Sequence, residues 1–371
     1  MIGIARSDIN DRRVLFTNTG DKTGLHPAII EKDFWVCYVL DYLFHRSEWK
    51  EALVFKGGTS LSKAFHVIKR FSEDIDLILD WRLIKYGIDE PWEERSHNQQ
   101  DKFNKLMIKT TAEYLQSVFV PAVKEGIRKE IGEDILVEMD PDDPDQCTVN
   151  IYYPHIFQEE YIRPEVRLEI GPIAEWTPSH KREIQPFASE CYPSIFDSPS
   201  TEILTVDAER TFWEKATILH KVACSGGPIA NRYARHYYDM YMLGNSDIKG
   251  EAFRRVDLLI RDINFKQKFY YTKKASYDTA VPGSIRLMPG KETTDALRAD
   301  YEHMKNMFYE NAPEWEKILE YLNRLEREIN AIEVVTELTD GDGHGNEVLE
   351  RRIADLKAGR NVHEHKLIEE D

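Results

Sequence analysis

Residues 52–79 constrain the fold of this chain more than any other segment. The run Ala52-Leu-Val-Phe55 predicts a short buried strand, which is followed by a glycine turn at Gly57 and Gly58. Beyond the turn, apolar residues recur at three- and four-residue spacing, which predicts a helix, and residues 74–79 alternate as a second strand. A strand, a glycine turn, a helix and a strand therefore follow one another within one short segment.

The second of these strands carries two carboxylates, Asp74 and Asp76. They point to the same face because residues two apart in a strand share a face. Two adjacent carboxylates repel each other unless a cation lies between them, and Mg²⁺ prefers such oxygen ligands. The glycine turn lets the backbone approach a ligand closely, and the helix that begins near Thr59 offers N–H groups to phosphates. This combination predicts phosphoryl or nucleotidyl transfer; the alternative is an ordinary turn and a solvent-facing strand edge.

Glu169 is the candidate for a third carboxylate. In the predicted strand 166–170, Leu168 and Ile170 face the core, so Glu169 faces the opposite side. If this strand neighbours the Asp74 strand, Glu169 lies beside the two aspartates and completes a site for two metal ions. An ordinary exposed strand glutamate is the alternative.

Lys215 is unusual because of its place on a predicted helix, residues 208–222. Apolar residues three, four and seven positions away share its face, so its ammonium group is directed inward and must find an anion. A nucleoside triphosphate is one such anion, and a buried structural ion pair is the alternative. Asp239 follows Arg235 by four residues, which a helical ion pair explains equally well.

The acidic composition limits which surfaces can bind nucleic acid. Lys and Arg number 49 against 66 Asp and Glu, a formal charge of −17, so RNA would need a local basic patch. The segment 264–274 carries four aromatic residues and no acid, together with Lys266, Lys268, Lys273 and Lys274. Lysines can follow a phosphate backbone while aromatic rings stack on bases, which makes this segment a candidate RNA site. The alternative is that its aromatics belong to the core.

The order of predicted elements indicates an α+β protein with a small mixed sheet flanked by helices and a mainly helical C-terminal region. We expect a leader over 1–25, a nucleotidyltransferase core over 26–200, a helical region over 201–335 that completes the active site, and a flexible linker and tail over 336–371. An early charged N-terminus and the lack of any apolar run of about 18 residues predict a cytoplasmic protein without a membrane anchor.

Several of these motifs resemble the nucleotidyltransferase AbiEii/AbiGii toxin family, over about residues 26 to 332. The first block, Gly-Gly-Thr-Ser-Leu-Ser-Lys-Ala followed by Arg-Phe-Ser-Glu-Asp-Ile-Asp-Leu, is highly specific. Further similar stretches are Glu31-Lys-Asp-Phe34, Arg210-Thr-Phe-Trp-Glu-Lys-Ala216, Arg235-His-Tyr-Tyr-Asp239 and the segment from Pro282 to Met304. The family has the DNA polymerase β-like nucleotidyltransferase fold and includes toxins of type IV toxin–antitoxin and phage-defence systems.

The resemblance implies roles for individual residues. Asp74 and Asp76 match the family's metal pair, Lys215 its active-site lysine and Asp239 its late aspartate. These residues, together with Glu169 from the strand pattern above, are the expected catalytic residues, and two Mg²⁺ ions are the expected cofactors. The phosphate-binding block comprises Gly57, Gly58, Thr59, Ser60 and Lys63, and Lys215 is expected to bind the nucleoside triphosphate as well. Fifteen residues separate Gly58 from Asp74, a long gap that leaves open whether Thr59 or Ser60 serves the phosphates.

The implied reaction transfers a nucleoside monophosphate from the triphosphate to an acceptor hydroxyl. Some relatives act on tRNA 3′ ends, so an RNA acceptor and a cognate antitoxin protein are the expected partners. Two alternatives remain: transfer to a protein hydroxyl, such as one on the antitoxin, and a catalytically silent module that acts by binding a partner.

Overall fold

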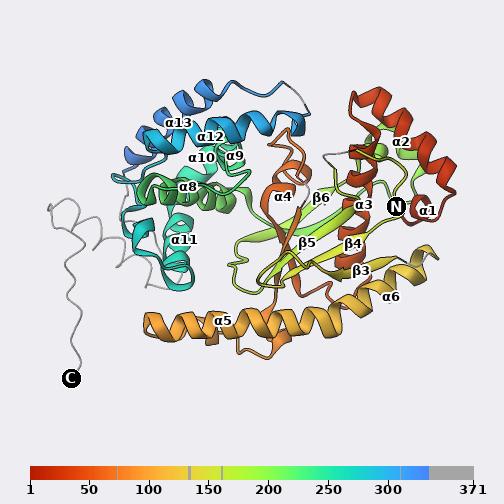
Figure 1. Cartoon of the computed structure of the whole chain (residues 1–371), viewed down its shortest axis with the longest axis horizontal. Coiled ribbons are helices and arrows are strands. Elements are labelled where there is room, and N and C mark those ends of the chain that lie inside the picture. The colour runs from red at the N-terminus through yellow and green to blue at the C-terminus, as the bar shows by residue number, and fades with distance from the viewer. Residues whose placement is uncertain (73, 133–134, 160–161, 310, 334–371) are drawn as a thin grey trace. The chain divides into compact units, whose positions relative to one another are not determined.

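The computed structural model describes residues 1–333 except 73, 133–134, 160–161 and 310 (Figure 1). The chain divides into two compact units. The first comprises Met1–Thr211 together with Lys305–Ala312, and the second comprises Phe212–Met304 with the described residues from Pro313 onward. The division therefore falls inside a helix, eleven residues later than the expected boundary at 200. The predicted tail, 336–371, lies outside the described residues.

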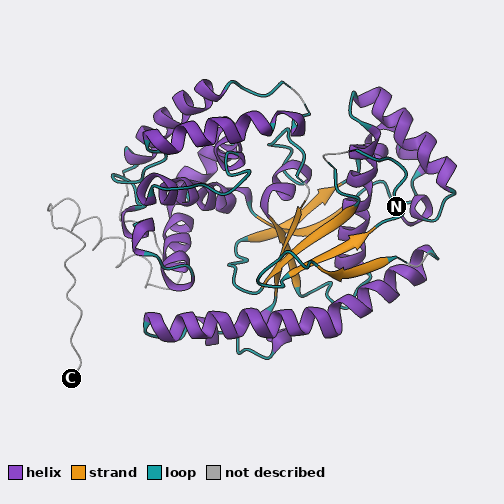
Figure 2. Ribbon diagram, viewed as in Figure 1, coloured by secondary structure: helices purple, strands orange, loops and turns teal. Residues whose placement is uncertain are grey.

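The first unit is built on one mixed sheet, which in the described part of the chain has seven strands in the order β3-β4-β5-β2-β1-β7-β6 (Figure 2). The pairs β2–β5 and β1–β7 are parallel, and the other neighbouring pairs are antiparallel. The strands are β1 (Leu53–Lys56), β2 (Asp74–Leu79), β3 (Leu136–Met139), β4 (Thr148–Tyr152), β5 (Glu165–Gly171), β6 (Ser179–Ile184) and β7 (Thr201–Val206). The α+β class predicted from the sequence is confirmed. The strand β3, however, lies where the sequence predicts no strand, and β7 adds to the sheet a stretch assigned to the helical region.

Helices flank this sheet. They are α1 (Ile2–Ala5), α2 (Ile9–Thr23), α3 (Pro27–His45), α4 (Gly57–Lys63), α5 (His97–Tyr114), α6 (Val120–Ile131) and α7 (Phe187–Cys191). A π-helical turn, Leu115–Phe119, joins α5 to α6, and α6 packs against β3 at the edge of the sheet (Figure 1). The residues expected to form a leader instead form α1 and α2. The helix α2 begins with a cap from Asp8, ends at Gly24 in the left-handed conformation and packs on α3, so it is part of the first unit.

The central helix α3 is almost wholly buried, although its second turn has three consecutive charged residues, Glu31, Lys32 and Asp33. Each one is compensated locally, as buried charges must be. The Glu31 carboxylate accepts the N–H groups of Ile156 and Phe157 at 2.8 and 3.1 Å, Lys32 donates to a backbone carbonyl, and Asp33 forms an ion pair described below. Burial nevertheless raises the pKa of Glu31 to about 7, despite the two N–H groups that stabilise its charged form.

The second unit is helical, as predicted. Its helices are α8 (Ala208–Ser225, from Phe212 onward), α9 (Arg235–Gly244), α10 (Ile248–Arg254), α11 (Val256–Phe269), α12 (Lys291–His303) and α13 (Trp315–Asn330). The apolar side of α13 is buried from Trp315 to Ile329. Among the described residues, no helix is both long and apolar enough to cross a membrane.

Candidate active site

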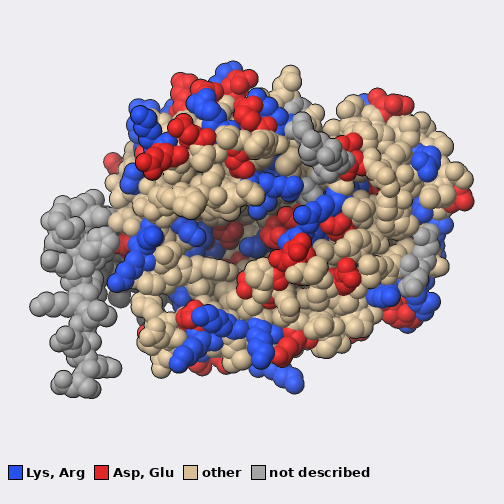
Figure 3. Space-filling view, in the orientation of Figure 1, with Lys and Arg blue, Asp and Glu red and all other residues tan. Residues whose placement is uncertain are grey.

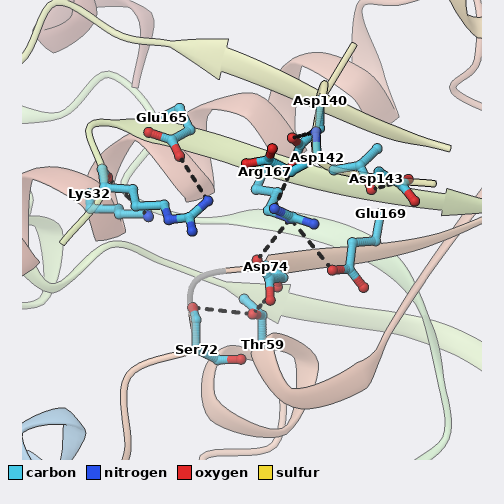
Figure 4. Close-up of polar contacts among 12 residues, drawn as sticks. Lys32, Thr59, Ser72, Asp74, Asp140, Asp142, Asp143, Glu165, Arg167 and Glu169 are labelled. Carbon is cyan, nitrogen blue, oxygen red and sulfur yellow. Dashed lines mark hydrogen bonds and ion pairs between the residues drawn. The ribbon is translucent and has the colours of Figure 1, made fainter. Parts of the chain in front are cut away.

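The register of the two central strands brings the three predicted carboxylates together. In the parallel pair β2–β5, Asp76 lies directly opposite Glu169, and Asp74 lies opposite Arg167 (Figure 4). Facing residues in a sheet share a face, so Asp74, Asp76 and Glu169 project from the same side. The expected neighbour relation between the strand of Glu169 and the strand of Asp74 is therefore found.

The burial pattern of β2 explains why the carboxylates face this side. Ile75 and Leu77 are at most 1% exposed and belong to the main core, which leaves the alternate positions to the opposite face. On that face the polar stretch is short. Ile78, two residues beyond Asp76, is buried in a small apolar cluster with Val54, Ala174 and Val206. Apolar packing thus bounds the carboxylates at the far end of the strand.

Arg167 places a positive charge among these carboxylates. Its Nε atom lies 3.6 Å from Asp74 Oδ1 and 3.6 Å from Glu169 Oε1, and its Nη1 atom lies 2.5 Å from Oδ2 of the buried Asp140 (Figure 4). Nε itself is buried and has no hydrogen-bond partner among the described residues. The guanidinium therefore neutralises the face electrostatically without filling the hydrogen-bonding capacity of either Asp74 or Glu169.

The glycine turn packs directly against the second aspartate. Gly57 has φ +81°, and a Cβ atom built on it would lie 1.9 Å from Asp76 Oδ2. A Cβ on Gly58 would lie 2.8 Å from the Ser72 hydroxyl and 2.9 Å from an Arg70 nitrogen. Both positions therefore require glycine for space, and Gly57 also requires it for its backbone conformation.

The side chains that follow the turn are occupied within the unit. The Thr59 hydroxyl donates to the carbonyl oxygens of Ser72 and Asp74, and it thereby fastens α4 to the start of β2 (Figure 4). The Ser60 hydroxyl is fully buried and donates to the Gly57 carbonyl at 2.8 Å. Both hydroxyls are therefore engaged by backbone carbonyls of the same unit.

Lys63 differs from the expectation that it contributes to the phosphate site. Its ammonium group is buried and lies 2.6 Å from Asp33 Oδ1, with the Phe187 ring 4.2 Å away. Burial alone would lower the pKa of Lys63, but the adjacent Asp33 carboxylate outweighs this and raises it. The pair ties α4 to α3, which makes Lys63 a structural residue behind the turn.

The chemistry of the carboxylate face fits a divalent cation. Asp74, Asp76 and Glu169 offer hard oxygen ligands, and the buried Nε of Arg167, which lies 3.6 Å from two of them, shows that the face accommodates positive charge. As the side chains stand, no three His, Cys, Asp or Glu residues in the described part of the chain are arranged around a common metal position. Residues that could hold a metal ion are thus adjacent, with Arg167 between two of them.

In the second unit, the predicted lysine and late aspartate form a pair. Lys215 Nζ lies 2.9 Å from Asp239 Oδ2 and 3.1 Å from Nδ1 of His236. Because a lysine ammonium only donates, His236 accepts through Nδ1 and is neutral in this arrangement. Asp239 is fully buried and Lys215 is 7% exposed. The expected alternative for Asp239, an ion pair with Arg235, is replaced by this contact with Lys215, which also satisfies the buried ammonium group.

The lysine-rich segment 264–274 is divided between core and surface. Phe265 and Phe269 are buried on α11, whereas Tyr270 and Tyr271 are about half exposed. Lys266 lies 3.1 Å from Asp262 Oδ2 and also donates to the Glu214 carbonyl, so the prediction that it belongs to an RNA surface is corrected. Lys268 is half-buried, and Lys273 and Lys274 are exposed in the short turn after the helix.

Three residues that contact the predicted site residues were not predicted from the sequence: Arg167, Asp140 and His236. Arg167 had a usable signal, since it precedes Glu169 by two positions and therefore shares its face. Asp140 and His236 had none, because an acid in an acid-rich loop and a histidine in a helix are common.

Comparison with family models assigns residues 39–322 to the family described as nucleotidyl transferase AbiEii toxin, type IV TA system. The chain belongs to this family. The AbiEii match includes the glycine turn, Asp74, Asp76, Glu169, Lys215 and Asp239, and it begins after the similar stretch Glu31–Phe34. The protein is accordingly an NTP-dependent nucleotidyltransferase of the toxin class.

Comparison with solved structures and with curated proteins gives two further findings. A solved structure, that of MenT4, a nucleotidyltransferase toxin from Mycobacterium tuberculosis H37Rv, is similar with a TM-score of 0.47 and 16% identity, over 93% of this chain and 99% of MenT4. No curated protein matches the sequence. The assignment to the AbiEii family rests on the family match itself.

Proposed function

We propose that the protein transfers a nucleoside monophosphate from a nucleoside triphosphate to an RNA hydroxyl in a reaction that requires a divalent cation. The observation that carries this proposal is the register of β2 and β5, which sets Glu169 beside Asp76 and next to Asp74 on one face. Three carboxylates so placed are the ligands that a metal-dependent phosphoryl-transfer site requires. A bound Mg²⁺ ion would polarise the acceptor hydroxyl and neutralise the leaving pyrophosphate.

Other residues of the chain would position the phosphates and bind the triphosphate. The backbone at Gly57 approaches the Asp76 carboxylate closely, which supports a role for the glycine turn in placing the phosphates beside the metal ligands. Lys215 is held by Asp239 and His236, and we propose that its ammonium group binds the triphosphate. In this proposal, Asp239 positions Lys215 and keeps it charged.

The surface around Tyr270–Lys274 favours an RNA acceptor over a protein acceptor. Two half-exposed tyrosines followed by Lys273 and Lys274 combine stacking surfaces with phosphate-binding charges. Figure 3 shows acidic and basic side chains interspersed over the face it presents, so a formal charge of −17 does not form one continuous acidic surface there. The tRNA 3′ end is the specific acceptor we propose, a cognate antitoxin is the proposed protein partner, and the cytoplasm is the proposed compartment.

The test incubates the purified protein with each labelled nucleoside triphosphate, Mg²⁺ and either total RNA or total protein. We expect label in RNA, and its loss by at least a hundredfold in Asp76→Asn and in Lys215→Met. The matched control is Asp142→Asn, since Asp142 is an exposed acid near the site with no side-chain contact to Asp74, Asp76 or Glu169. Label in protein alone would instead support transfer to an antitoxin, and equal transfer by Asp76→Asn would refute the site.

A further inference from the structure

The guanidinium of Arg167 lies where the proposed function needs a metal ion. Its Nε is 3.6 Å from one oxygen of Asp74 and 3.6 Å from one oxygen of Glu169, the two carboxylates that flank it (Figure 4). A divalent ion binds carboxylate oxygens at a little over 2 Å and draws them inward around itself. The guanidinium and the ion therefore cannot use the same two carboxylates at the same time.

Asp140 gives the guanidinium a second partner on the opposite side. Its Oδ2 lies 2.5 Å from Nη1 of Arg167, and the residue is only 3% exposed. The carboxylate is itself held in place, because its Oδ1 accepts the N–H of Asp142 at 2.9 Å. The same turn is fixed further by Asp143, which accepts from Cys147 N and the Thr148 hydroxyl. Asp140 is thus a rigid anchor that does not belong to the three carboxylates of the proposed metal site.

These contacts give Arg167 two unequal sets of interactions. The ion pair of Nη1 with Asp140 is short and buried, whereas the two contacts through Nε are 3.6 Å long. Neither Nε nor Asp140 Oδ2 forms a hydrogen bond with any residue that the structure describes. Nε can therefore leave Asp74 and Glu169 without breaking a hydrogen bond, while Nη1 keeps its ion pair. The movement of lowest energetic cost for this side chain is therefore one that breaks the two Nε contacts and keeps the ion pair with Asp140.

We propose that Arg167 is an internal counter-ion of the metal site. In the metal-free protein it neutralises Asp74 and Glu169, and when a divalent cation binds it withdraws from both and stays paired with Asp140. Arg167 competes with the cation in this way, so it sets the metal affinity of the protein. The inference rests on the proposed function, because that function assigns the carboxylates to a metal ion.

The experiment measures binding of Mn²⁺ alone to the full-length chain by titration calorimetry, without nucleotide. Two variants remove the competitor: Arg167→Gln, and the double variant Arg167→Gln with Asp140→Asn. The double variant leaves the summed charge of the pair unchanged, and Asn keeps an oxygen that can accept the Asp142 N–H. It therefore separates competition from a simple change in the electrostatic field. It also avoids leaving Asp140 buried and unpaired, which protects the test if the single variant does not fold.

The control is Arg163→Gln, which removes the same charge just before β5, from a side chain 59% exposed whose ion pair, 4.0 Å long, is with Glu165. We expect the dissociation constant for Mn²⁺ to fall at least tenfold in both Arg167 variants and to change less than twofold in the control. We also expect a larger rise in melting temperature on adding Mn²⁺ to the Arg167 variants than to the wild type. This second readout does not depend on activity.

The outcomes distinguish the two proposals. If the wild type and the double variant bind Mn²⁺ equally, Arg167 does not compete with the ion; the inference is then wrong while the metal site stands. If binding tightens in the single variant but not in the double variant, the effect is one of field alone, which also overturns the inference. If none of the four proteins binds Mn²⁺, the metal site fails, and the proposed function and the inference fail together.

Discussion

Replacing Gly57 with alanine should separate the contribution of the glycine turn to catalysis from its contribution to stability. The residue has φ +81°, where an alanine costs about 1–2 kcal/mol relative to glycine. In addition, the new Cβ would lie 1.9 Å from Oδ2 and 2.6 Å from Cγ of Asp76. Real contacts of this kind are above 3 Å, so the carboxylate must move by about an ångström or more.

Gly24 provides a matched control. It has φ +73° at the end of α2, and a Cβ built on it meets no atom within 4 Å. Gly24→Ala therefore carries the same backbone cost without any contact to the site. Gly24→Ala should lower the free energy of unfolding by about 1–2 kcal/mol, which corresponds to a fall in Tm of roughly 2–8 °C for domains of this size. Gly57→Ala should lower it by at least as much, because its Cβ also displaces the Asp76 carboxylate.

Nucleotide transfer should respond quite differently. A misplacement of about 1 Å at a reacting group costs on the order of a hundredfold in rate, so Gly57→Ala should lose about that factor in kcat. Gly24→Ala should retain wild-type kcat. The assay is transfer of labelled nucleotide at saturating substrate, measured well below the Tm of both variants. Equal kcat in the two variants would show that the close approach of Gly57 to Asp76 has no catalytic role.

Three further predictions concern other buried and exposed charges. Lys63→Met should destabilise the protein by about 3–5 kcal/mol in chemical denaturation, because it leaves the buried Asp33 carboxylate without its ion-pair partner. The double variant Lys63→Met with Asp33→Leu should recover most of this loss. Equal stability of the single and double variants would contradict a stabilising role of the pair. The raised pKa of Glu31, about 7 against 4.5, means that its protonated form is favoured in the folded state, so its contribution is full below pH 4.5 and is lost as the pH rises through 7, by about 3 kcal/mol. The difference in unfolding free energy between Glu31→Gln and the wild type should therefore change over that interval, and a constant difference would refute the assignment. Replacing Lys273 and Lys274 by Gln should raise KM for RNA and reduce its salt dependence while leaving KM for the nucleotide unchanged, and an unaltered salt slope would exclude this segment as the acceptor site.

Much of the first unit could be predicted from local patterns. The strand, glycine turn, helix and strand of residues 52–79 are all present, because each depends on alternation or helical spacing of apolar residues within a few positions. The sequence predicts no strand at β3 or β7, for a physical reason. An edge strand of four residues among acids has little apolar signal, and β7 lies directly before the helix whose pattern dominates that stretch.

In the candidate site, too, some features follow from the sequence and others only from the tertiary structure. The sequence by itself determined which residue types are available: two aspartates on one strand face, a glutamate at the matching position of another strand, and a lysine on an apolar helix face. Only the tertiary structure decided their partners, since strand order and register arise from packing of the whole sheet. That packing places Arg167 between Asp74 and Glu169, anchors it on Asp140, and turns Lys63 away into an ion pair with Asp33. A side chain's neighbours across a sheet come from distant parts of the sequence, and no local pattern records them.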